Sequence, residues 1–165
     1  MIEIKGKVVD LKSVIEADAK FILELRQNLD LNKFISSTSS NLENQRSWIK
    51  SYLIREKEKK EFYFIIKDKN SNSCGTVRIY GIDNEKKECT WGSFMLNKNR
   101  PDGASYETIN LSLKYAFDIL NMKKIFLGVH KENKKAIYIY EKVGFKRISQ
   151  DLENYYYIIE KIEIN

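Results

Sequence analysis

The sequence predicts a single α/β domain over residues 1–165, with seven strands in a mixed sheet and helices on both faces. Two observations support this fold class. Apolar residues repeat with a helical period in segments between residue 18 and about residue 58, and with a strand-like period from residue 61. Two apolar segments, 88–96 and 123–129, flank one amphipathic helix, and such a crossover makes the two strands parallel.

The N-terminal part contains one strand and two helices by its apolar pattern. Residues 2–9 alternate charged and apolar side chains, which predicts a first strand. Residues 18–28 form an amphipathic helix, and a longer helix runs from residue 41 to about residue 58. Between them, residues 30–40 are rich in Ser, Thr and Asn, which predicts a short helical turn and a loop.

The remaining elements follow from shorter apolar runs and the turns between them. Residues 61–68 predict a strand buried on both faces, paired with 76–82 in a hairpin and followed by the strand at 88–96. The chain then crosses through a helix at 103–121 to the strand at 123–129. A helix at 133–143 and strands at 144–149 and 154–164 complete the fold. A hairpin edge or the apolar last strand could pair with a second copy, so a homodimer is an open alternative.

The charge balance indicates no nucleic-acid partner. The chain has 29 basic and 23 acidic residues and a net charge of +6. Its lysines are scattered, and no RNA- or DNA-binding motif is present. A basic surface equally favours anionic small molecules.

The composition also predicts no membrane span and no metal. No apolar run approaches 18 residues, and the first residues lack the apolar centre of a secretory signal. Cys74 and Cys89 are the two cysteines, too few for a disulfide framework or a Cys/His metal cluster. We therefore expect a cytoplasmic protein.

The turn from Arg100 to Ser105, RPDGAS, is the first candidate binding feature. A helix N-terminus presents unpaired amides and a positive dipole end, which suit a pyrophosphate. Gly103 allows the backbone to approach a ligand closely, and Arg100 can reach phosphate oxygens. The alternative is a loop that only enters a helix.

The helix at 133–143 carries the second candidate feature. Tyr140 lies on its apolar stripe and is either a core tyrosine or a general acid that protonates a departing thiolate. Asn133 is either a helix N-cap or a side-chain amide that contacts a cofactor, and one residue can do both.

These two features together resemble the GNAT superfamily of acetyl-CoA-dependent N-acetyltransferases. RPDGAS resembles the family's Q/R-x-x-G-x-G/A turn, with Ser105 at its last position, and KKIFLGVHKENKKAIYIYEKVGF resembles the strand and helix ending in N…A…Y…GF. The order of elements agrees along nearly the whole chain. The resemblance implies a mostly antiparallel sheet with a splay between the fourth and fifth strands, opened by a bulge, where acetyl-CoA binds.

The resemblance also assigns roles to particular residues. Backbone amides of the splayed strand would hold the acetyl carbonyl and pantetheine arm, and those of the turn would hold the pyrophosphate. Tyr140 would be the general acid. The implied cofactor-binding residues are Phe94, Met95, Leu96, Arg100, Asp102, Gly103, Ala104, Ser105, Asn133 and Tyr140.

The general base stays open. Many relatives carry a Glu on the central strand where this sequence has Thr90. Glu88, His130 and a water chain are the alternatives, and an imidazole with a pKa near 6.5 titrates in a useful range.

The acceptor is expected to be a small-molecule amine. LRQN at 25–28, FISSTS at 34–39 and QRSWI at 45–49 resemble a branch that includes ribosomal-protein N-terminal and nucleotide-amino-sugar acetyltransferases, and place Arg26, Asn28 and Trp48 in an acceptor pocket. We favour the amino group of a nucleotide-linked amino sugar in surface-glycan synthesis. Alternatives are a protein N-terminus, a polyamine, an antibiotic amine, or a non-catalytic acyl-CoA-binding module.

Overall fold

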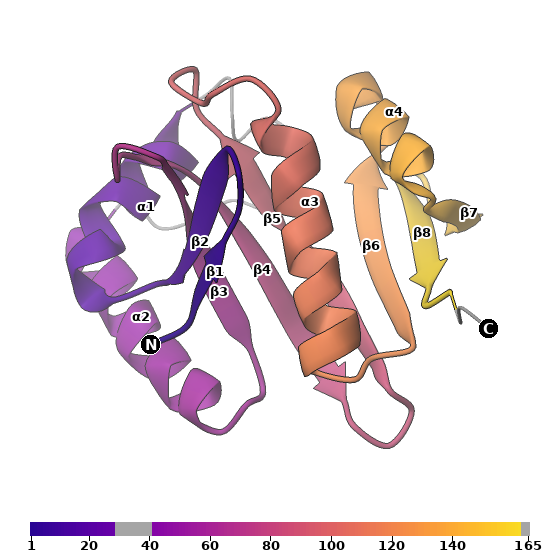
Figure 1. The fold of residues 1–165 in the computed structure, drawn as a ribbon, viewed down its shortest axis with the longest axis horizontal. Coiled ribbons are helices and arrows are strands. Elements are labelled where there is room, and N and C mark those ends of the chain that lie inside the picture. Colours follow the sequence, from indigo (N-terminus) through magenta and orange to yellow (C-terminus); the bar gives the residue numbers. More distant parts are fainter. Residues whose placement is uncertain (29–40, 163–165) are drawn as a thin grey trace.

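The computed structural model describes residues 1–28 and 41–162, and these form one sheet between two layers of helices (Figure 1). The predicted loop at 30–40, including the acceptor segment 34–39, lies outside the described residues. In the described part of the chain, the sheet has eight strands in the order β1-β2-β3-β4-β5-β6-β8-β7. The strands are β1 (Glu3–Lys5), β2 (Val9–Ser13), β3 (Phe62–Asp68), β4 (Ser73–Asp83), β5 (Glu88–Leu96), β6 (Lys124–His130), β7 (Lys146–Gln150) and β8 (Asn154–Glu160).

The helices cover both faces, as predicted. They are α1 (Ala19–Gln27), α2 (Leu42–Lys57), α3 (Ala104–Lys114) and α4 (Lys134–Val143), with a 3₁₀ turn η1 (Glu16–Asp18) and a π-helical turn η2 (Tyr115–Ile119) that continues α3. α3 and α4 lie on one face and α1 and α2 on the other (Figure 1). No helix among residues 1–28 and 41–162 is long and apolar enough to cross a membrane.

The strand count of seven was wrong because the predicted first strand is a hairpin. Residues 2–9 turn back at Gly6, whose amide donates a 3.1 Å hydrogen bond to Asp10 Oδ1. Glu107 of α3 holds the turn, because its Oε1 accepts from the amides of Val8 (2.8 Å) and Val9 (3.0 Å). A Cβ on Gly6 would lie 1.9 Å from the same oxygen, so this close approach requires glycine.

The predicted last strand also differs in extent and position. β8 ends at Glu160 and lies between β6 and β7, so it is not a free edge. β7 is the edge strand at this end of the sheet, and its residues are exposed. The last strand therefore has no free edge for pairing with a second copy, and the edges of the described sheet are β1 and β7.

The core has two parts, one on each side of the sheet. On one side, Phe64 and Ile66 of β3 pack in the cluster that includes residues of α3 and α4. On the other side, Tyr63 and Ile65 pack with residues of α1 and α2. β3 is thus buried on both faces, which confirms the reading of its uninterrupted apolar run.

Candidate active site

β5 and β6 separate after a short stretch of parallel pairing. The three pairs between them are Glu88–Lys124, Cys89–Ile125 and Thr90–Phe126, all within the described residues. Both strands continue beyond this point, β5 to Leu96 and β6 to His130. The splay predicted between the fourth and fifth strands is therefore present, between β5 and β6 in this numbering.

A bulge in β5 lies where the two strands have separated. The register with β4 steps from Thr76–Met95 to Arg78–Gly92, so β5 contains one extra residue. Ser93 takes up this residue with a φ of 48°, in the left-handed region. The Thr76 hydroxyl donates a 2.9 Å hydrogen bond to the Ser93 carbonyl oxygen and so stabilises the bulge.

The strand after the bulge directs backbone groups toward the splay. The Asn97 amide donates to the Cys74 carbonyl oxygen at 2.8 Å, so it faces β4. Because amide direction alternates along a strand, the Leu96 N–H faces the β6 side, where pairing has ended. Met95 and Leu96 have buried side chains, and the Phe94 ring lies 5.3 Å from Trp91. Their side chains fix the strand while the Leu96 amide stays available.

The turn before α3 has the backbone form expected of an anion site. Gly103 is the N-cap residue, with a φ of 84° that favours glycine. The Ala104 amide donates to the Pro101 carbonyl oxygen at 3.2 Å and is already engaged. The amides of Asp102, Gly103, Ser105 and Tyr106 make no hydrogen bond with any residue that the structure describes. Four donors thus remain at the positive end of the helix.

A cavity of about 460 Å³ lies over this turn. It is lined by Lys98, residues 100–106 and Ile139 of α4. Arg100 is exposed, and its guanidinium donates to the Asn97 carbonyl oxygen at 3.2 Å. The cavity combines unpaired amides with cationic side chains, which is the chemistry a diphosphate requires.

Tyr140 connects α4 to the separated strand. Its ring packs at 5.5 Å, edge to face, against Trp91, the first β5 residue beyond the pairs with β6. Phe145 packs against its other side at 6.0 Å. Trp91 is itself fixed, because its indole N–H donates to Ser112 Oγ at 2.8 Å. The neighbouring Ile139 lines the turn cavity, so Tyr140 lies between the phosphate turn and the splay.

Burial raises the pKa of Tyr140 above its usual value. The side chain is 7% exposed, and its hydroxyl makes no hydrogen bond with any described residue. The phenol therefore stays protonated at neutral pH. A proton donor without a protein partner is consistent with a general acid and also with a core tyrosine.

The other residues of the α4 motif have local structural roles. Asn133 is the N-cap, and its Oδ1 accepts from the Ala136 amide at 3.4 Å. Gly144 ends the helix with a φ of 124°, and the Phe145 amide donates to the Tyr140 carbonyl oxygen at 3.0 Å. The motif therefore fixes the end of α4 and the rotation of Tyr140.

The two base candidates lie at opposite ends of the two strands that form the splay. His130 is the last residue of β6, half-buried, and its Nδ1 accepts from the Glu132 amide at 3.2 Å. Glu88 begins β5 and pairs with Lys124 in the closed part of the sheet. Six residues of strand separate Glu88 from Phe94, or about 20 Å. The structure does not bring Glu88 to the bulge.

The acceptor candidates lie on the other face of the sheet, with α1 and α2. Trp48 stacks on Tyr52 at 6.0 Å and meets Tyr63 edge to face at 5.6 Å. Burial raises the pKa of Tyr63, and the nearby positive charge of Arg26 opposes this effect. Asn28 is the C-cap of α1. Trp48 and Arg26 therefore meet around Tyr63, whereas Asn28 ends the helix.

An ion-pair group beside the bulge was missed at the sequence level. Glu61 is 5% exposed and pairs with Arg55 at 3.1 Å and with Arg78. The Arg78 guanidinium lies 4.2 Å from the Tyr80 ring centre and 5.4 Å from that of Trp48. Arg78 is also the partner of Gly92, next to the bulge. The available signal was the alternation of β4, which places Arg78 and Tyr80 on one face.

Comparison with known proteins identifies the family. A model of the acetyltransferase (GNAT) domain matches residues 9–146. The chain therefore belongs to the GNAT acetyltransferase family.

Individual relatives differ in the acceptors that their names give. A solved nucleotide-linked sugar GNAT, FdhC, is 35% identical with a TM-score of 0.88, over 96% of this chain and 90% of that one. The spermidine N(1)-acetyltransferase of Vibrio cholerae is 30% identical over 93 residues, 56% of this chain. The match spans about half, 54%, of that enzyme. The acetyltransferase PseH of Campylobacter jejuni is 23% identical over 93% of this chain and 95% of its own length.

Proposed function

We propose that this protein transfers an acetyl group from acetyl-CoA to the primary amine of a nucleotide-linked amino sugar. The supporting observation is the convergence of three features at one splay in the sheet. These are the bulged edge of β5 at Ser93, the open turn at Gly103 and the buried Tyr140. Each feature alone could serve only the stability of the fold. Their presence together at one splay fits the transfer of an acyl group.

The chain's own groups suffice to hold and polarise the donor. The open amides of residues 102–106 and the Arg100 guanidinium would bind the diphosphate. The Leu96 N–H, which faces the splay, would donate to the thioester carbonyl as charge develops on its oxygen. Bound acetyl-CoA supplies a thioester that an amine can attack directly, so no metal is needed.

Tyr140 would return a proton to the departing sulfur. Because burial raises its pKa, donation leaves a costly buried phenolate unless a proton arrives from elsewhere. We therefore infer that proton loss from the attacking amine is coupled to donation by Tyr140. His130, or a water chain that ends at it, is the base that the position favours.

The charge on the acceptor face favours an anionic acceptor. Arg55 and Arg78 share the single carboxylate of Glu61, so this group of three side chains carries one net positive charge. A polyamine would be repelled there, whereas a nucleoside diphosphate would be attracted. The 35% identity to a nucleotide-linked sugar GNAT supports the same choice. The spermidine acetyltransferases are the relatives that favour the second candidate, a polyamine acceptor.

An amine panel tests the proposal. Thiol release from acetyl-CoA would be measured with nucleoside-diphosphate-linked amino sugars, the free amino sugars, spermidine, an aminoglycoside and a peptide N-terminus. We expect the nucleotide-linked sugar to have the highest kcat/KM, by about a hundredfold over the free sugar, and a KM that rises with salt. If spermidine has the highest kcat/KM of the panel, the nucleotide-linked amino sugar is rejected as the acceptor. Binding of acetyl-CoA without turnover of any amine would favour an acyl-CoA-binding module.

A further inference from the structure

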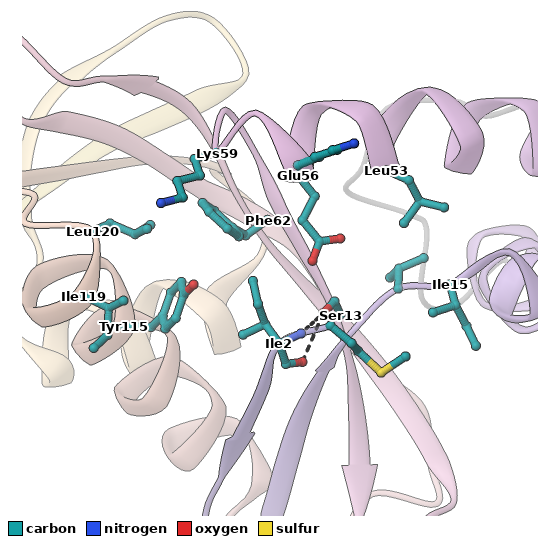
Figure 2. A pocket seen from close by; sticks show the side chains of 13 residues that line it. Ile2, Ser13, Ile15, Leu53, Glu56, Lys59, Phe62, Tyr115, Ile119 and Leu120 are labelled. Carbon is teal, nitrogen blue, oxygen red and sulfur yellow. Dashed lines mark hydrogen bonds between the residues drawn. The ribbon is translucent and has the colours of Figure 1, made fainter.

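A second cavity, of about 630 Å³, lies at the far end of α3 from the phosphate turn (Figure 2). The N-terminal hairpin, the end of α2 and the π-helical turn η2 surround it. Eleven residues of helix separate Ala104 from Tyr115, or about 16 Å. The cavity is therefore distinct from the cavity at the phosphate turn.

The walls of this cavity are mainly apolar. They include Ile15, Leu53, Phe62 and Ile119, contributed by four separate segments. Ile15 is 40% exposed and Ile119 is 63% exposed, so the apolar surface continues out of the mouth. The volume falls within the range of small-molecule sites, about 300–1,000 Å³. A π-helical turn in the wall is also a frequent feature of functional sites.

One carboxylate enters this apolar space. Glu56 of α2 is half-buried, and Figure 2 shows its side chain pointing into the cavity. It forms no ion pair with any residue in the described part of the chain. Burial raises the pKa of Tyr115, and the charge of Glu56 raises it further, which places the two groups near each other. Lys57 and Lys59 also line the cavity, but both are exposed to solvent.

We propose that this cavity binds a small protonated amine with an apolar body. The ammonium pairs with the Glu56 carboxylate, and the body packs between Ile15, Leu53 and Ile119. The Glu56 carboxylate interacts with the Tyr52 side chain but has no cationic partner among the described residues, and a ligand cation supplies one. The exposed lysines keep their hydration and need no partner. The site is independent of the proposed acetyl transfer.

Binding is tested without acetyl-CoA, with a probe that cannot become a stable amide. N,N-dimethylhexylamine carries an ammonium group and an apolar chain, but it is a tertiary amine and so cannot be converted into a stable amide. We expect calorimetry to show binding about tenfold tighter than that of 1-hexanol, with hexanoate weakest. Glu56→Gln should lower the affinity for the amine about tenfold and leave that for hexanol unchanged. Lys57→Gln, a matched change on the same helix, should preserve or slightly tighten amine binding.

Three results would overturn the proposal. The first is hexanoate binding as tightly as the amine. The second is unchanged amine affinity in Glu56→Gln or, should that variant not fold, in Ile119→Trp, which fills the mouth from an exposed position. The third is sedimentation of the protein as a dimer that Ile119→Lys converts to monomer, which would assign this face to a second copy.

Discussion

The Thr76 hydroxyl donates a hydrogen bond to the Ser93 carbonyl oxygen across β4 and β5, and this bond spans the bulge that accompanies the splay. Thr76 is 1% exposed, so water does not replace the donor if it is removed. Ser93 has no glycine-like freedom at its φ of 48° and depends on its surroundings to stay there. The bond therefore links a buried β4 side chain to the geometry of the candidate acetyl site.

Replacing Thr76 with Val should weaken this bulge. The Ser93 carbonyl loses its donor, which costs about 1–3 kcal/mol of the free energy of unfolding. The KM for acetyl-CoA should rise as the β5 amides move. Thr76→Ser retains the hydroxyl and is the control. Urea unfolding measures the loss of stability, and steady-state kinetics measure the KM. An unchanged KM in Thr76→Val would mean that the Thr76–Ser93 hydrogen bond does not influence the binding of acetyl-CoA.

Replacing Tyr140 with Phe should lower kcat by about 10²–10⁴-fold, the usual contribution of a general acid. The ring contacts with Trp91 and Phe145 remain, so the Kd for acetyl-CoA should not change. Tyr138→Phe, on the same helix but 65% exposed, should behave as wild type. A Tyr140→Phe enzyme with normal kcat would mean that the proton reaches sulfur by another route.

Gly103 should tolerate Asn far better than Asp. A Cβ there meets nothing nearer than Val8 Cγ2 at 4.0 Å, so backbone strain rather than space sets the cost. Asn and Asp both enter the left-handed region more readily than other side chains, and Asp adds a negative charge beside the phosphate cavity. Calorimetry with CoA should show binding at least about tenfold weaker for Gly103→Asp than for Gly103→Asn. Equal affinities would reject a diphosphate at this turn.

The buried tyrosines predict a loss of stability at alkaline pH. Burial raises the pKa of Tyr52, Tyr63 and Tyr140 in the folded state. The unfolded phenols titrate near pH 10, so above that pH the unfolded state releases protons that the folded state retains. Below pH 10 these tyrosines make a constant contribution to the free energy of unfolding. Above pH 10 each tyrosine lowers that free energy by about 1.4 kcal/mol per pH unit. Urea unfolding from pH 8 to 11 should show a shallower decline for Tyr140→Phe, and identical slopes would contradict the shifted pKa.

Local patterns predicted those parts of the fold that local interactions determine. The β3–β4 hairpin, the crossover through α3 and the motif around Asn133 and Gly144 follow from periodicity, turn residues and helix caps. Gly103 was singled out because glycine lets the backbone approach a ligand closely, and the structure adds a φ of 84° that also favours glycine.

The parts that were missed depend on contacts between distant segments. Alternation continues across Gly6, so nothing local marks the hairpin, which Glu107 stabilises from about a hundred residues away. The bulge occurs in SFML, which lacks glycine, and follows from the register with β4 and the Thr76 bond. The group of Arg55, Glu61 and Arg78 joins α2 to β4 and to the residue that precedes β3, and it has no signature in any one segment.

The contact of Glu107 with the amides of Val8 and Val9 also orders events during synthesis. The N-terminal hairpin is synthesised before α3, so the amides of Val8 and Val9 have no Glu107 acceptor until α3 has been made. The first turn of α3, in turn, is held against the sheet by the hairpin that precedes it in the chain. A nascent chain stalled before residue 107 therefore lacks the acceptor for the Val8 and Val9 amides, and a fragment that starts after the hairpin lacks the two donors to Glu107.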